Sequence, residues 1–355
     1  MNEKILVINP GSTSTKIAVF DGEKEVFSKI LRHDAEQLQQ YRYIADQKDY
    51  RKEIVSEALR ENDYALTDFA AIACRGGLVR QMPGGTYRVN DALVGDSQKG
   101  VSGQHASNLG ALIGYELEKE SGVPAYIVDP PVVNELSNVA RYSGHPLIER
   151  VCVFHALNQK AVARHYADSI GRPYEELNLL VCHMGGGVSV GAHVHGKVLD
   201  TEDAVSGEGP FSPERAGSLP VNRVVDLCFG GNMTKGEIKR MLTRKSGLLA
   251  YVGTNDMREL LQKAADGDGK VQEALDAFYY QVAKEIGTMS MAMKGQVDQI
   301  ILTGGIAHSN VVTDAITALV DWIAPVTVYP GEDEMLALVQ GVLRVLRCEE
   351  TAKEY

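Results

Sequence analysis

The amino-acid sequence predicts an α/β protein built from two related domains. Short apolar runs of β character alternate with helical patterns along the chain. The length of 355 residues exceeds what one ordinary hydrophobic core accommodates. A strand–turn–strand pattern with a glycine-containing turn occurs twice, which is typical of a duplicated unit.

The repeat is one of residue type rather than of identity. Its first copy reads ILVINPGSTSTKIAVFDGEKEVFSK, and its second reads LLVCHMGGGVSVGAHVHGKVLDTED. Each copy is an apolar strand, a glycine-containing turn, a second strand, a small turn at Gly22 or Gly196, and a third strand. Two such domains would each present one glycine-rich hairpin to a cleft between them, which is a common place for a ligand site.

The elements follow from the hydrophobic periodicity. In the first part we expect strands at 4–9, 15–21, 24–31, 69–74 and 125–128, and helices near 48–61 and 104–121. In the second part we expect strands at 178–184, 187–195, 197–202, 298–303 and 326–329. The strongest helical pattern covers 270–293, where apolar residues recur every three or four positions. The methionines on that face are therefore predicted to be core residues.

Composition excludes several classes of protein. The net charge of −11 argues against a nucleic-acid partner, which favours basic patches. No apolar run has the length of a membrane span, and the first apolar run is too short for a signal peptide. The five cysteines are scattered without a C-x-x-C pair, so we expect reduced core residues and a cytoplasmic location.

The turn INPGSTSTK, residues 8–16, combines a glycine, four consecutive hydroxyl residues and Lys16. One interpretation is a solvated hairpin, because Asn, Pro, Gly and Ser are ordinary turn residues. The other is a phosphate cradle, in which backbone N–H groups, hydroxyls and the lysine face an anion. It is not a Walker A loop, which needs a glycine immediately before the lysine.

Two further glycine turns favour the phosphate interpretation. In HMGGGVS, three consecutive glycines between strands are costly to order, so we expect close approach of the backbone to a ligand. In ILTGGIAHSN, Gly304 and Gly305 lie between a strand and a helix with Ser309 or Asn310 as N-cap. A nucleotide could lie against such a turn with its anionic part facing the helix N-terminus.

Three charged residues and one acidic run are candidates for the chemistry. Arg75 and Arg215 stand beside small residues, and arginine is suited to bidentate contact with carboxylate or phosphoryl oxygens. Asp129 ends a strand and is followed by two prolines, a reasonable setting for a Mg²⁺ ligand. The acidic run 332–334 could contribute too, or could serve as first-turn helix acids.

The histidines are weaker candidates. His105 lies near a helix start, His155 lies where an apolar run becomes a helix, and His183 ends a strand at the triple glycine. Each of these residues alone is more often structural than catalytic. His193 and His195 share one strand face without a visible third ligand, so we expect no metal site there.

Taken in order, VINPGSTSTK, HMGGGVS, LTGGIAHSN and PGEDEMLALVQG resemble the motifs of the acetate and butyrate kinase family. That family belongs to the acetate and sugar kinase, heat-shock ATPase and actin superfamily. The likeness runs from residue 4 to about residue 345 and is closer to the butyrate kinase branch. The chain has Asn9-Pro10-Gly11 where acetate kinases read N-A-G, Gly186 where they read the Asn of G-N-G, and GGIAH at 304–308 where they read GGIGE.

The resemblance implies a fold and a domain division. It implies two domains of duplicated actin/ribonuclease H-like fold with an interdomain cleft. The first domain would cover 1–148 and, through a returning C-terminal helix, 331–355. The second, nucleotide-binding domain would cover 149–330. We also expect a homo-oligomer that contacts neither nucleic acid nor membrane.

The resemblance also implies roles for individual residues. Asn9, Ser12, Ser14 and His105 would bind the phosphate and acid substrate, and Lys16, Arg75, Asp129, His155 and Arg215 would act in catalysis. Asp129 and Glu334 would be the acids around Mg²⁺, with Asp333 or Glu332 as alternatives if the register slips. His183, Gly185, Gly186, Gly187, Asp256, Met257, Arg258, Gly304 and Gly305 would line the ATP site.

The activity implied is that of a butyrate kinase. Such an enzyme transfers the γ-phosphoryl group of ATP reversibly to a short-chain carboxylic acid, giving an acyl phosphate and ADP. Acetate or propionate kinase activity is the alternative within the family. A nucleotide-gated actin-like module and a phosphatase-type hydrolase are alternatives on the same fold. The two arginines argue against a simple ATPase switch, which has no reason to need them.

Overall fold

The computed structural model describes residues 3–355 and divides them into two compact units. The N-terminal unit contains residues up to Asn134 together with Asp333–Tyr355. The C-terminal unit contains Glu135–Glu332. Within residues 3–355, no helix combines the length and the apolar composition needed to cross a bilayer.

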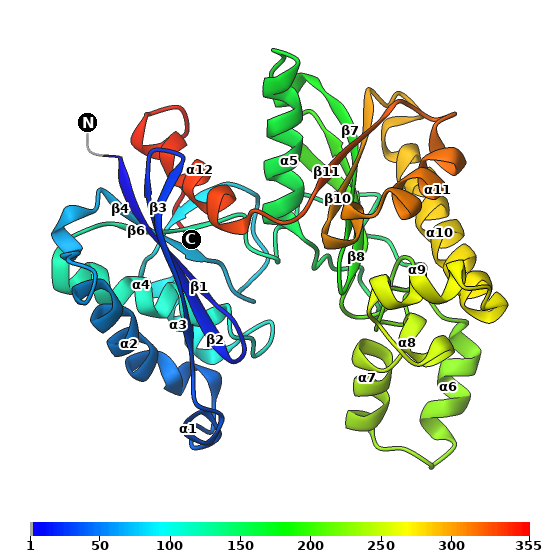
Figure 1. Ribbon diagram of the computed structural model, residues 1–355, viewed down its shortest axis with the longest axis horizontal. Helices are drawn as coiled ribbons and strands as arrows, with labels where there is room; N and C mark the ends of the chain where they lie inside the picture. The colour runs from blue at the N-terminus through cyan, green and yellow to red at the C-terminus, as the bar shows by residue number, and fades with distance from the viewer. Residues whose placement is uncertain (1–2) are drawn as a thin grey trace. The chain divides into compact units, whose positions relative to one another are not determined.

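The described residues of the N-terminal unit form a six-stranded sheet in the order β3-β2-β1-β4-β6-β5 (Figure 1). The strands are β1 (Lys4–Pro10), β2 (Ser14–Asp21), β3 (Lys24–Arg32), β4 (Ala71–Arg75), β5 (Thr86–Arg88) and β6 (Ala125–Val128). The first three are antiparallel neighbours, and β4 and β6 extend the sheet in parallel to β1. Strand β5, too short for a periodicity signal, pairs with β6 in antiparallel orientation.

Both faces of this sheet are covered by helices. The helices are α1 (Ala35–Gln39), α2 (Lys48–Arg60), α3 (Asp91–Lys99), α4 (Asn108–Ser121) and α12 (Glu334–Leu346), with 3₁₀ turns at Ile44–Gln47 and Leu66–Asp68. Leu6 and Ile8 of β1 pack into the core under α2, α3 and α4, whereas α12 covers the opposite face (Figure 1). Alternate residues of β1 are therefore buried on both sides, which gives the unbroken apolar run of that strand.

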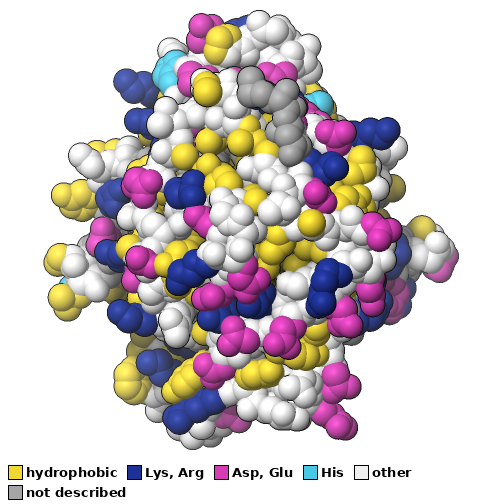
Figure 2. Space-filling view, turned by 90° about the vertical axis from the view of Figure 1, so that its left-hand side faces the viewer, with side chains coloured by type: hydrophobic (Ala, Val, Ile, Leu, Met, Phe, Trp, Pro, Cys, Tyr) yellow, Lys and Arg dark blue, Asp and Glu magenta, His cyan; other side chains and the backbone are white. Residues whose placement is uncertain are grey.

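The surface of the N-terminal unit carries mixed charge. On the face drawn in Figure 2, lysine and arginine side chains lie among aspartate and glutamate side chains, with apolar side chains between them. Helices α2 and α4 illustrate the pairing, because Lys48 contacts Glu116 at 3.1 Å and Lys52 contacts Glu120. Solvent-accessible pairs of this kind contribute little to stability.

The C-terminal unit, described throughout residues 135–332, contains a five-stranded sheet in the order β11-β10-β7-β8-β9. The strands are β7 (Asn178–Met184), β8 (Val188–Val194), β9 (Lys197–Thr201), β10 (Gln299–Gly304) and β11 (Val326–Pro330). Strands β7, β8 and β9 form an antiparallel meander, and β10 and β11 extend it in parallel to β7. The predicted repeat is confirmed, because β1–β3 and β7–β9 share this arrangement.

Helices also cover both faces of the second sheet. The helices of this unit are α5 (Ala156–Ser169), α6 (Val221–Phe229), α7 (Lys235–Arg244), α8 (Gly247–Val252), α9 (Met257–Ala265), α10 (Gly269–Met289) and α11 (Asn310–Val320), with 3₁₀ turns at Tyr174–Glu176, Ser290–Met293 and Gly305–His308. Helix α5 packs on the face that carries Leu179 and Val181, and α10 and α11 pack on the face of Leu180 and Cys182 (Figure 1).

Helix α10 confirms the predicted pattern. Asp268 caps it by accepting hydrogen bonds from the backbone N–H groups of residues 270 and 271. Its apolar face is buried, including Met289, and Met293 in the following turn is buried as well. The methionines are core residues, as the spacing predicts.

The domain boundary lies earlier than the sequence indicates. Residues 135–148, assigned to the first domain by resemblance, belong to the C-terminal unit because they attach to β9. The backbone N–H of Ser137 donates to the carbonyl of Leu199 at 2.9 Å. The buried carboxylate of Glu135 accepts from the backbone N–H of Val198 and pairs with Lys160 at 2.9 Å. At the other end the division falls at 332/333 rather than at 330/331.

Two of the five cysteines also differ from expectation. Cys74, Cys152 and Cys182 are buried, and burial raises the pKa of all three thiols. Cys228 and Cys348 are exposed, so the prediction of a core position is wrong for these two. Cys228 lies on α6, none of whose residues is buried.

Candidate active site

In the N-terminal unit, the carboxyl ends of three neighbouring strands carry predicted site residues. Asn9 lies near the end of β1, Arg75 is the last residue of β4, and Asp129 directly follows β6. Strands β1, β4 and β6 run parallel, and Arg75 pairs in register with Val128. The fold therefore places these three residues at one edge of the sheet.

Glu334 joins Arg75 and Asn9 at this edge. One of its carboxylate oxygens forms an ion pair with Nη1 of Arg75, and the other accepts a hydrogen bond from Nδ2 of Asn9 at 2.9 Å. The Nε–H group of Arg75 is buried without a hydrogen-bond partner among residues 3–355. A buried charged donor without an acceptor is costly, so this nitrogen is suited to an anionic oxygen.

The acidic run 332–334 separates into three different environments. Asp333 caps α12, because its carboxylate accepts from the backbone N–H of Leu336 at 3.1 Å. Glu332 belongs to the C-terminal unit, where it contacts Nε2 of His183 at 3.1 Å. Of the three acids, Glu334 is the one that lies beside Arg75.

The hairpin INPGSTSTK is held by a buried arginine that sequence reasoning missed. Arg51 of α2 donates from Nη1 to the carbonyls of Gly11 (2.7 Å) and Ser14 (3.1 Å), and from Nη2 to the carbonyl of Ser12 (3.0 Å). Burial lowers the pKa of Arg51 to about 10, so the side chain is still charged at neutral pH. The sequence does contain a sign of its burial, because Arg51 lies four residues before Val55 and therefore on the buried face of α2.

Ser12, Ser14 and Lys16 of the same hairpin lie on its outer side, whereas Thr15 is buried. Lys16 is half-buried and stands opposite Asn9 in the antiparallel register, so both side chains lie on the sheet face that α12 covers. Ser12 is exposed and Ser14 is half-buried. Because Arg51 holds carbonyls of the turn from inside, these polar side chains remain available to a ligand outside it.

His105 contacts Ser107, and Asp129 contacts Gly85 just before β5. Nδ1 of His105 lies 2.8 Å from the Ser107 hydroxyl and accepts from the backbone N–H of Ser107. Asp129 has a left-handed backbone with φ of 36°, which is strained for a residue with a side chain. Its buried carboxylate accepts from the backbone N–H of Gly85 at 2.7 Å.

In the C-terminal unit, the triple-glycine hairpin between β7 and β8 contacts Arg215 and His155. A Cβ atom at position 187 would lie under 3.0 Å from the Arg215 guanidinium and 3.4 Å from Cε1 of His155. A Cβ atom at position 185 would lie 3.3 Å from Nε2 of His183. Close approach of side chains to the backbone, rather than turn geometry, therefore accounts for Gly187.

Arg215 is held by the loop that follows β9. Its Nη1 donates to the carbonyl of Ala204 at 2.9 Å, and its backbone N–H donates to the Ser212 hydroxyl. Burial lowers the pKa of Arg215. A half-buried cation in this position is primed to pair with an anion.

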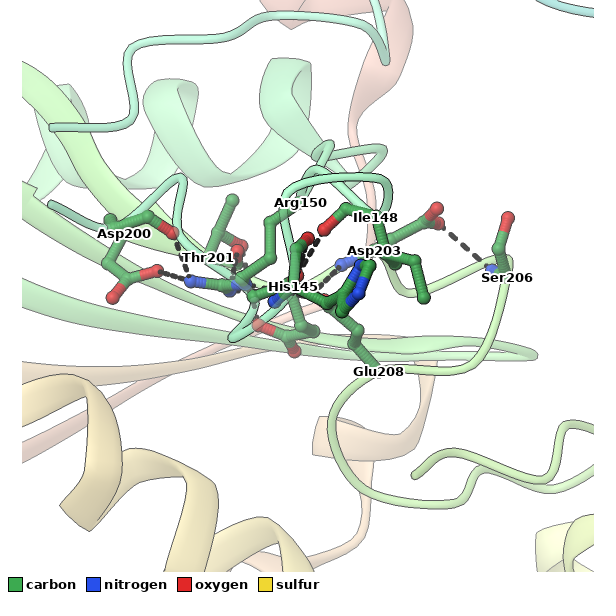
Figure 3. Close-up of polar contacts among 11 residues, drawn as sticks. His145, Ile148, Arg150, Asp200, Thr201, Asp203, Ser206 and Glu208 are labelled. Carbon is green, nitrogen blue, oxygen red and sulfur yellow. Dashed lines mark hydrogen bonds and ion pairs between the residues drawn. The ribbon is translucent and has the colours of Figure 1, made fainter. Parts of the chain in front are cut away.

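The loop that carries Ala204 is itself tied down by Arg150 (Figure 3). The Arg150 guanidinium contacts the carboxylates of Asp200 (3.1 Å) and Glu208 (3.3 Å) and donates to the carbonyl of Thr201 (3.0 Å). Asp203 closes the turn by accepting from the backbone N–H of Ser206 at 2.9 Å. Sequence reasoning missed Arg150, because its partners lie about 50 residues away along the chain.

His155 and His183 stack against each other. Their ring centroids are 3.7 Å apart, and the ring planes differ by 11°. Nδ1 of His155 lies 2.7 Å from the Ser189 hydroxyl, and Nδ1 of His183 lies 2.7 Å from Oδ1 of Asn158. The two rings are therefore oriented from β8 and α5 respectively.

The second glycine turn has two unlike positions. Gly304 has a φ of 91°, and a Cβ atom there would lie under 3.0 Å from backbone atoms of Met184. Gly305 is exposed, and a Cβ atom there would meet nothing within 4 Å. Gly304 is thus required by the fold, whereas Gly305 has no such requirement. Ser309 is the N-cap residue of α11, as predicted.

The predicted nucleotide-binding segment 256–258 is the start of α9. Asp256 caps that helix by accepting from the backbone N–H of Arg258 at 2.9 Å. The two side chains also form an ion pair at 3.0 Å. Met257 packs against the core of the C-terminal unit. These described contacts lie within or directly beneath α9, and none of them involves a glycine turn.

Each unit therefore carries one cluster of site residues. The first cluster is Asn9, Lys16, Arg75 and Glu334, with Asp129 at the same sheet edge. The second is His155, His183, Gly185, Gly187 and Arg215. Among residues 3–355, no three His, Cys, Asp or Glu side chains lie close enough together to hold a metal ion by themselves.

Comparison with known proteins identifies the family. Residues 139–322 match the Acetokinase family. The chain is 51% identical over 355 residues to a probable butyrate kinase of Clostridium botulinum, with both chains covered completely. It is 52% identical over 352 residues to butyrate kinase 1 of Clostridium acetobutylicum, covering 99% of each. The chain belongs to the acetokinase family.

Two solved structures resemble this chain in fold. This acetokinase-family chain matches an acetate kinase of Porphyromonas gingivalis with a TM-score of 0.79 and 18% identity, covering 97% of this chain and 99% of the other. It matches a propionate kinase of Francisella tularensis with a TM-score of 0.78 and 21% identity, covering 96% and 99%. At such identities the likeness shows the fold, which is that expected from the resemblance.

Proposed function

We propose that this acetokinase-family chain is a butyrate kinase. It transfers the γ-phosphoryl group of ATP reversibly to the carboxylate of butyrate, or of a related short or branched-chain fatty acid. The observation that carries the proposal is the 51% identity over the full length of both chains to a protein named probable butyrate kinase. The free thiols of all five cysteines support a cytoplasmic location.

The reaction needs positioning and charge neutralisation more than it needs acid–base chemistry. A carboxylate oxygen of the acid forms a bond to the γ-phosphorus while the bond to the oxygen of ADP breaks. The carboxylate is already ionised at neutral pH, so no strong base is required. Both reactants are anions, and the chain has a net charge of −11, so local cations must offset the repulsion.

The described contacts support roles for three cations. Arg75, with its unpartnered Nε–H, would hold the carboxylate or a phosphoryl oxygen. Arg215, half-buried against Gly187, would stabilise the charge that develops on the transferring group. Lys16 would contact phosphate oxygens together with Asn9, Ser12 and Ser14. His155 would donate a hydrogen bond to the transferring phosphoryl group, and His105 would donate one to the acid.

The glycine turns would bind the nucleotide. His183, Gly185, Gly186 and Gly187 would approach its phosphates, and Gly304, Gly305 and the segment 256–258 would line its remaining surface. Support differs between these positions. Gly305 is exposed and sterically open, whereas Asp256 already serves as a helix cap.

The acids at the sheet edge fit a magnesium ion. Asp129 and Glu334 offer carboxylate oxygens at neighbouring strand and helix ends, and Mg²⁺ is commonly bound by one or two carboxylates plus waters and phosphates. The ion would neutralise phosphate charge when it is bound. Because Glu334 also pairs with Arg75 and Asn9, its carboxylate would link the metal to the acid-binding arginine.

Hydroxamate formation tests the proposal directly. The purified protein is incubated with Mg²⁺, ATP, hydroxylamine and one acid from a panel running from acetate to branched five-carbon acids. We expect hydroxamate in equal amount to ADP, with the highest kcat/KM for a four- or five-carbon acid. A maximum at acetate or propionate would reassign the substrate within the family. ADP release without hydroxamate from any acid would instead indicate an ATPase or a nucleotide-gated module.

A further inference from the structure

A continuous chain of hydrogen bonds leads through the C-terminal unit to His155. We call Tyr174, His193, Gln159 and Ser189 the buried relay; each of them is at most 3% exposed. Tyr174 Oη lies 2.7 Å from Nδ1 of His193, whose Nε2 lies 3.0 Å from Oε1 of Gln159. Nε2 of Gln159 lies 2.8 Å from Oγ of Ser189, which in turn lies 2.7 Å from Nδ1 of His155.

The direction of these hydrogen bonds is set at one point. The side-chain nitrogen of Gln159 also lies 3.1 Å from the carbonyl oxygen of Ser189. A carbonyl oxygen can only accept, so the atom facing it must be the amide nitrogen. That nitrogen donates one hydrogen to the Ser189 carbonyl and the other to the Ser189 hydroxyl. The amide oxygen is thereby turned to His193.

The orientation of Gln159 determines the state of His193. An amide oxygen accepts only, so Nε2 of His193 must carry a proton. Burial, with Lys160 and Arg164 nearby, lowers the pKa of His193 well below its usual value, so the ring is neutral. Nδ1 then carries a lone pair, and the Tyr174 hydroxyl donates to it.

The same logic extends to His155. The Ser189 oxygen accepts from Gln159, and the backbone N–H of His155 also points to it at 3.5 Å. With its lone pairs engaged in this way, the hydroxyl directs its hydrogen at Nδ1 of His155. A neutral His155 that accepts at Nδ1 carries its own proton on Nε2.

Gly191 of β8 leaves room for the centre of the relay. A Cβ atom at this position would lie under 3.0 Å from Oε1 of Gln159 and 2.9 Å from Nε2 of His193. Any side chain there would push these two residues apart and break the hydrogen bond between them. The backbone conformation of Gly191 does not itself require glycine, because its φ is not in the left-handed region. Glycine at position 191 therefore leaves the space that Gln159 and His193 occupy.

We propose that the buried relay holds His155 as the tautomer with its proton on Nε2, and that its four members are positioning residues for phosphoryl transfer. The inference rests on the proposed role of His155 at the phosphoryl group. This tautomer offers the transferring group a hydrogen-bond donor and keeps the lone pair of the ring turned to Ser189. His155 then acts by hydrogen bonding rather than as a nucleophile.

Nitrogen-15 NMR of the full-length protein tests the tautomer without relying on activity. Long-range ¹H–¹⁵N spectra distinguish the two neutral tautomers of each of the nine histidines, and His155→Gln and His193→Gln identify the two signals of interest. At neutral pH we expect the Nε2–H pattern for both residues. An Nδ1–H pattern for His155 in the unaltered protein would overturn the proposal before any relay variant is made.

Ser189→Ala then removes the hydroxyl and keeps the carbonyl that orients Gln159. We expect the His155 signals to shift towards a mixture of tautomers while those of His193 stay unchanged, with kcat about tenfold lower and KM for ATP within about twofold. The matched control is Tyr166→Phe on α5, the helix that carries Gln159. It loses a hydroxyl that contacts Gln299 at 3.0 Å and lies outside the relay. It should change neither the His155 signals nor kcat.

Two results separate the inference from the proposed function. Unchanged His155 signals and unchanged kcat in Ser189→Ala would overturn the relay and leave carboxylate kinase activity standing. Wild-type kcat in His155→Gln would overturn the role given to His155, and with it the positioning role of the relay, even if the spectra show the expected tautomer.

Discussion

Gly187 and the guanidinium of Arg215 share a space that no other residue type at position 187 would leave open. A Cβ atom there would lie under 3.0 Å from both Nη1 and Cζ of Arg215. The guanidinium cannot simply retreat, because Nη1 also donates to the carbonyl of Ala204. The glycine is therefore part of the site that places the arginine.

Gly187→Ala should displace Arg215 and lower kcat. We expect a loss of about a hundredfold, comparable with that of Arg215→Ala, because each removes one charge-assisted contact to the transferring group. Since both changes act through one guanidinium, the double variant should be no slower than Arg215→Ala. Gly287→Ala in α10, where a Cβ atom meets nothing within 4 Å, is the control for a harmless glycine replacement. Steady-state kinetics that show additive losses would contradict the coupling.

Lys16→Met should separate function from stability in the first hairpin. Methionine keeps much of the length and apolar surface of the lysine, so the melting temperature of the ligand-free protein should hardly change. Turnover and the thermal shift produced by Mg-ATP plus acid should fall strongly. A replaced surface lysine would change stability by no more than about 0.5 kcal/mol and leave the kinetics unchanged. Full activity of Lys16→Met would therefore show that the hairpin is an ordinary solvated turn.

Arg51→Met is the matched comparison from inside the same hairpin. It removes the side chain that donates to the carbonyls of Gly11, Ser12 and Ser14, although the Ser14 carbonyl keeps its second donor, the backbone N–H of Gly11 at 2.7 Å. Each lost partner costs on the order of 1–3 kcal/mol, so the melting temperature should fall clearly. Equal melting temperatures for the two variants in differential scanning calorimetry would contradict the clamp.

Gly305→Val should weaken nucleotide binding while leaving the fold intact. The position is exposed and open, so a branched side chain occupies space that we assign to ADP rather than to protein. We expect a rise in KM for ATP of tenfold or more, by a steric cost above about 1.4 kcal/mol. Gly304→Ala should instead destabilise the protein, because it meets the backbone of Met184 at a φ of 91°. If calorimetry finds an unchanged ADP affinity for Gly305→Val, the turn has only a structural role.

His33 should make the stability of the first hairpin depend on pH. Its Nε2 lies 2.8 Å from the Thr15 hydroxyl, and burial, with Arg51 nearby, lowers its pKa to about 4. In the unfolded chain its pKa is about 6.5, so between these values the unfolded state binds a proton that the folded state excludes. The contribution of His33 to the free energy of unfolding is therefore full above about pH 6.5 and is lost as the pH falls towards 4.

Urea unfolding at pH 7.5, 6 and 5 measures this effect. We expect the unaltered protein to lose roughly 1–2 kcal/mol more than His33→Gln between pH 7.5 and 5. Glu202, whose pKa is raised by burial, gives a slope of opposite sign in both proteins and cancels in the difference. Parallel curves for the two proteins would show that His33 does not titrate in this way.

Local patterns predicted most of the strands and the repeat. Strand β6 and strand β7 have the predicted bounds, and β1, β2 and β10 differ by one residue at one or both ends. Their apolar runs are continuous because helices cover both faces, and such runs can be recognised in the sequence alone. Strand β5 and most helices of the C-terminal unit were not predicted, because β5 has three residues and α6 buries none of its apolar side chains.

The candidate site was predicted as residue types more than as an arrangement. The motifs and the resemblance pointed to Arg75, Arg215 and His155 before any contact was known. They could not tell which acid of the run 332–334 accompanies Arg75, because each of the three is equally plausible as a helix-start acid. The structure separates them: one pairs with a histidine, one caps α12, and Glu334 contacts Arg75 and Asn9.

By itself, then, the sequence determined the α/β class, the duplicated strand pattern and the family, because hydrophobic periodicity and glycine turns are properties of short segments. Tertiary structure alone decided the clamp of Arg51 on the hairpin, the fit of Gly187 against Arg215, and the relay that ends at His155. Each of these joins residues that lie between 19 and 40 positions apart along the chain. Folding brings such residues together through burial and hydrogen bonding, and no local pattern records which partners meet.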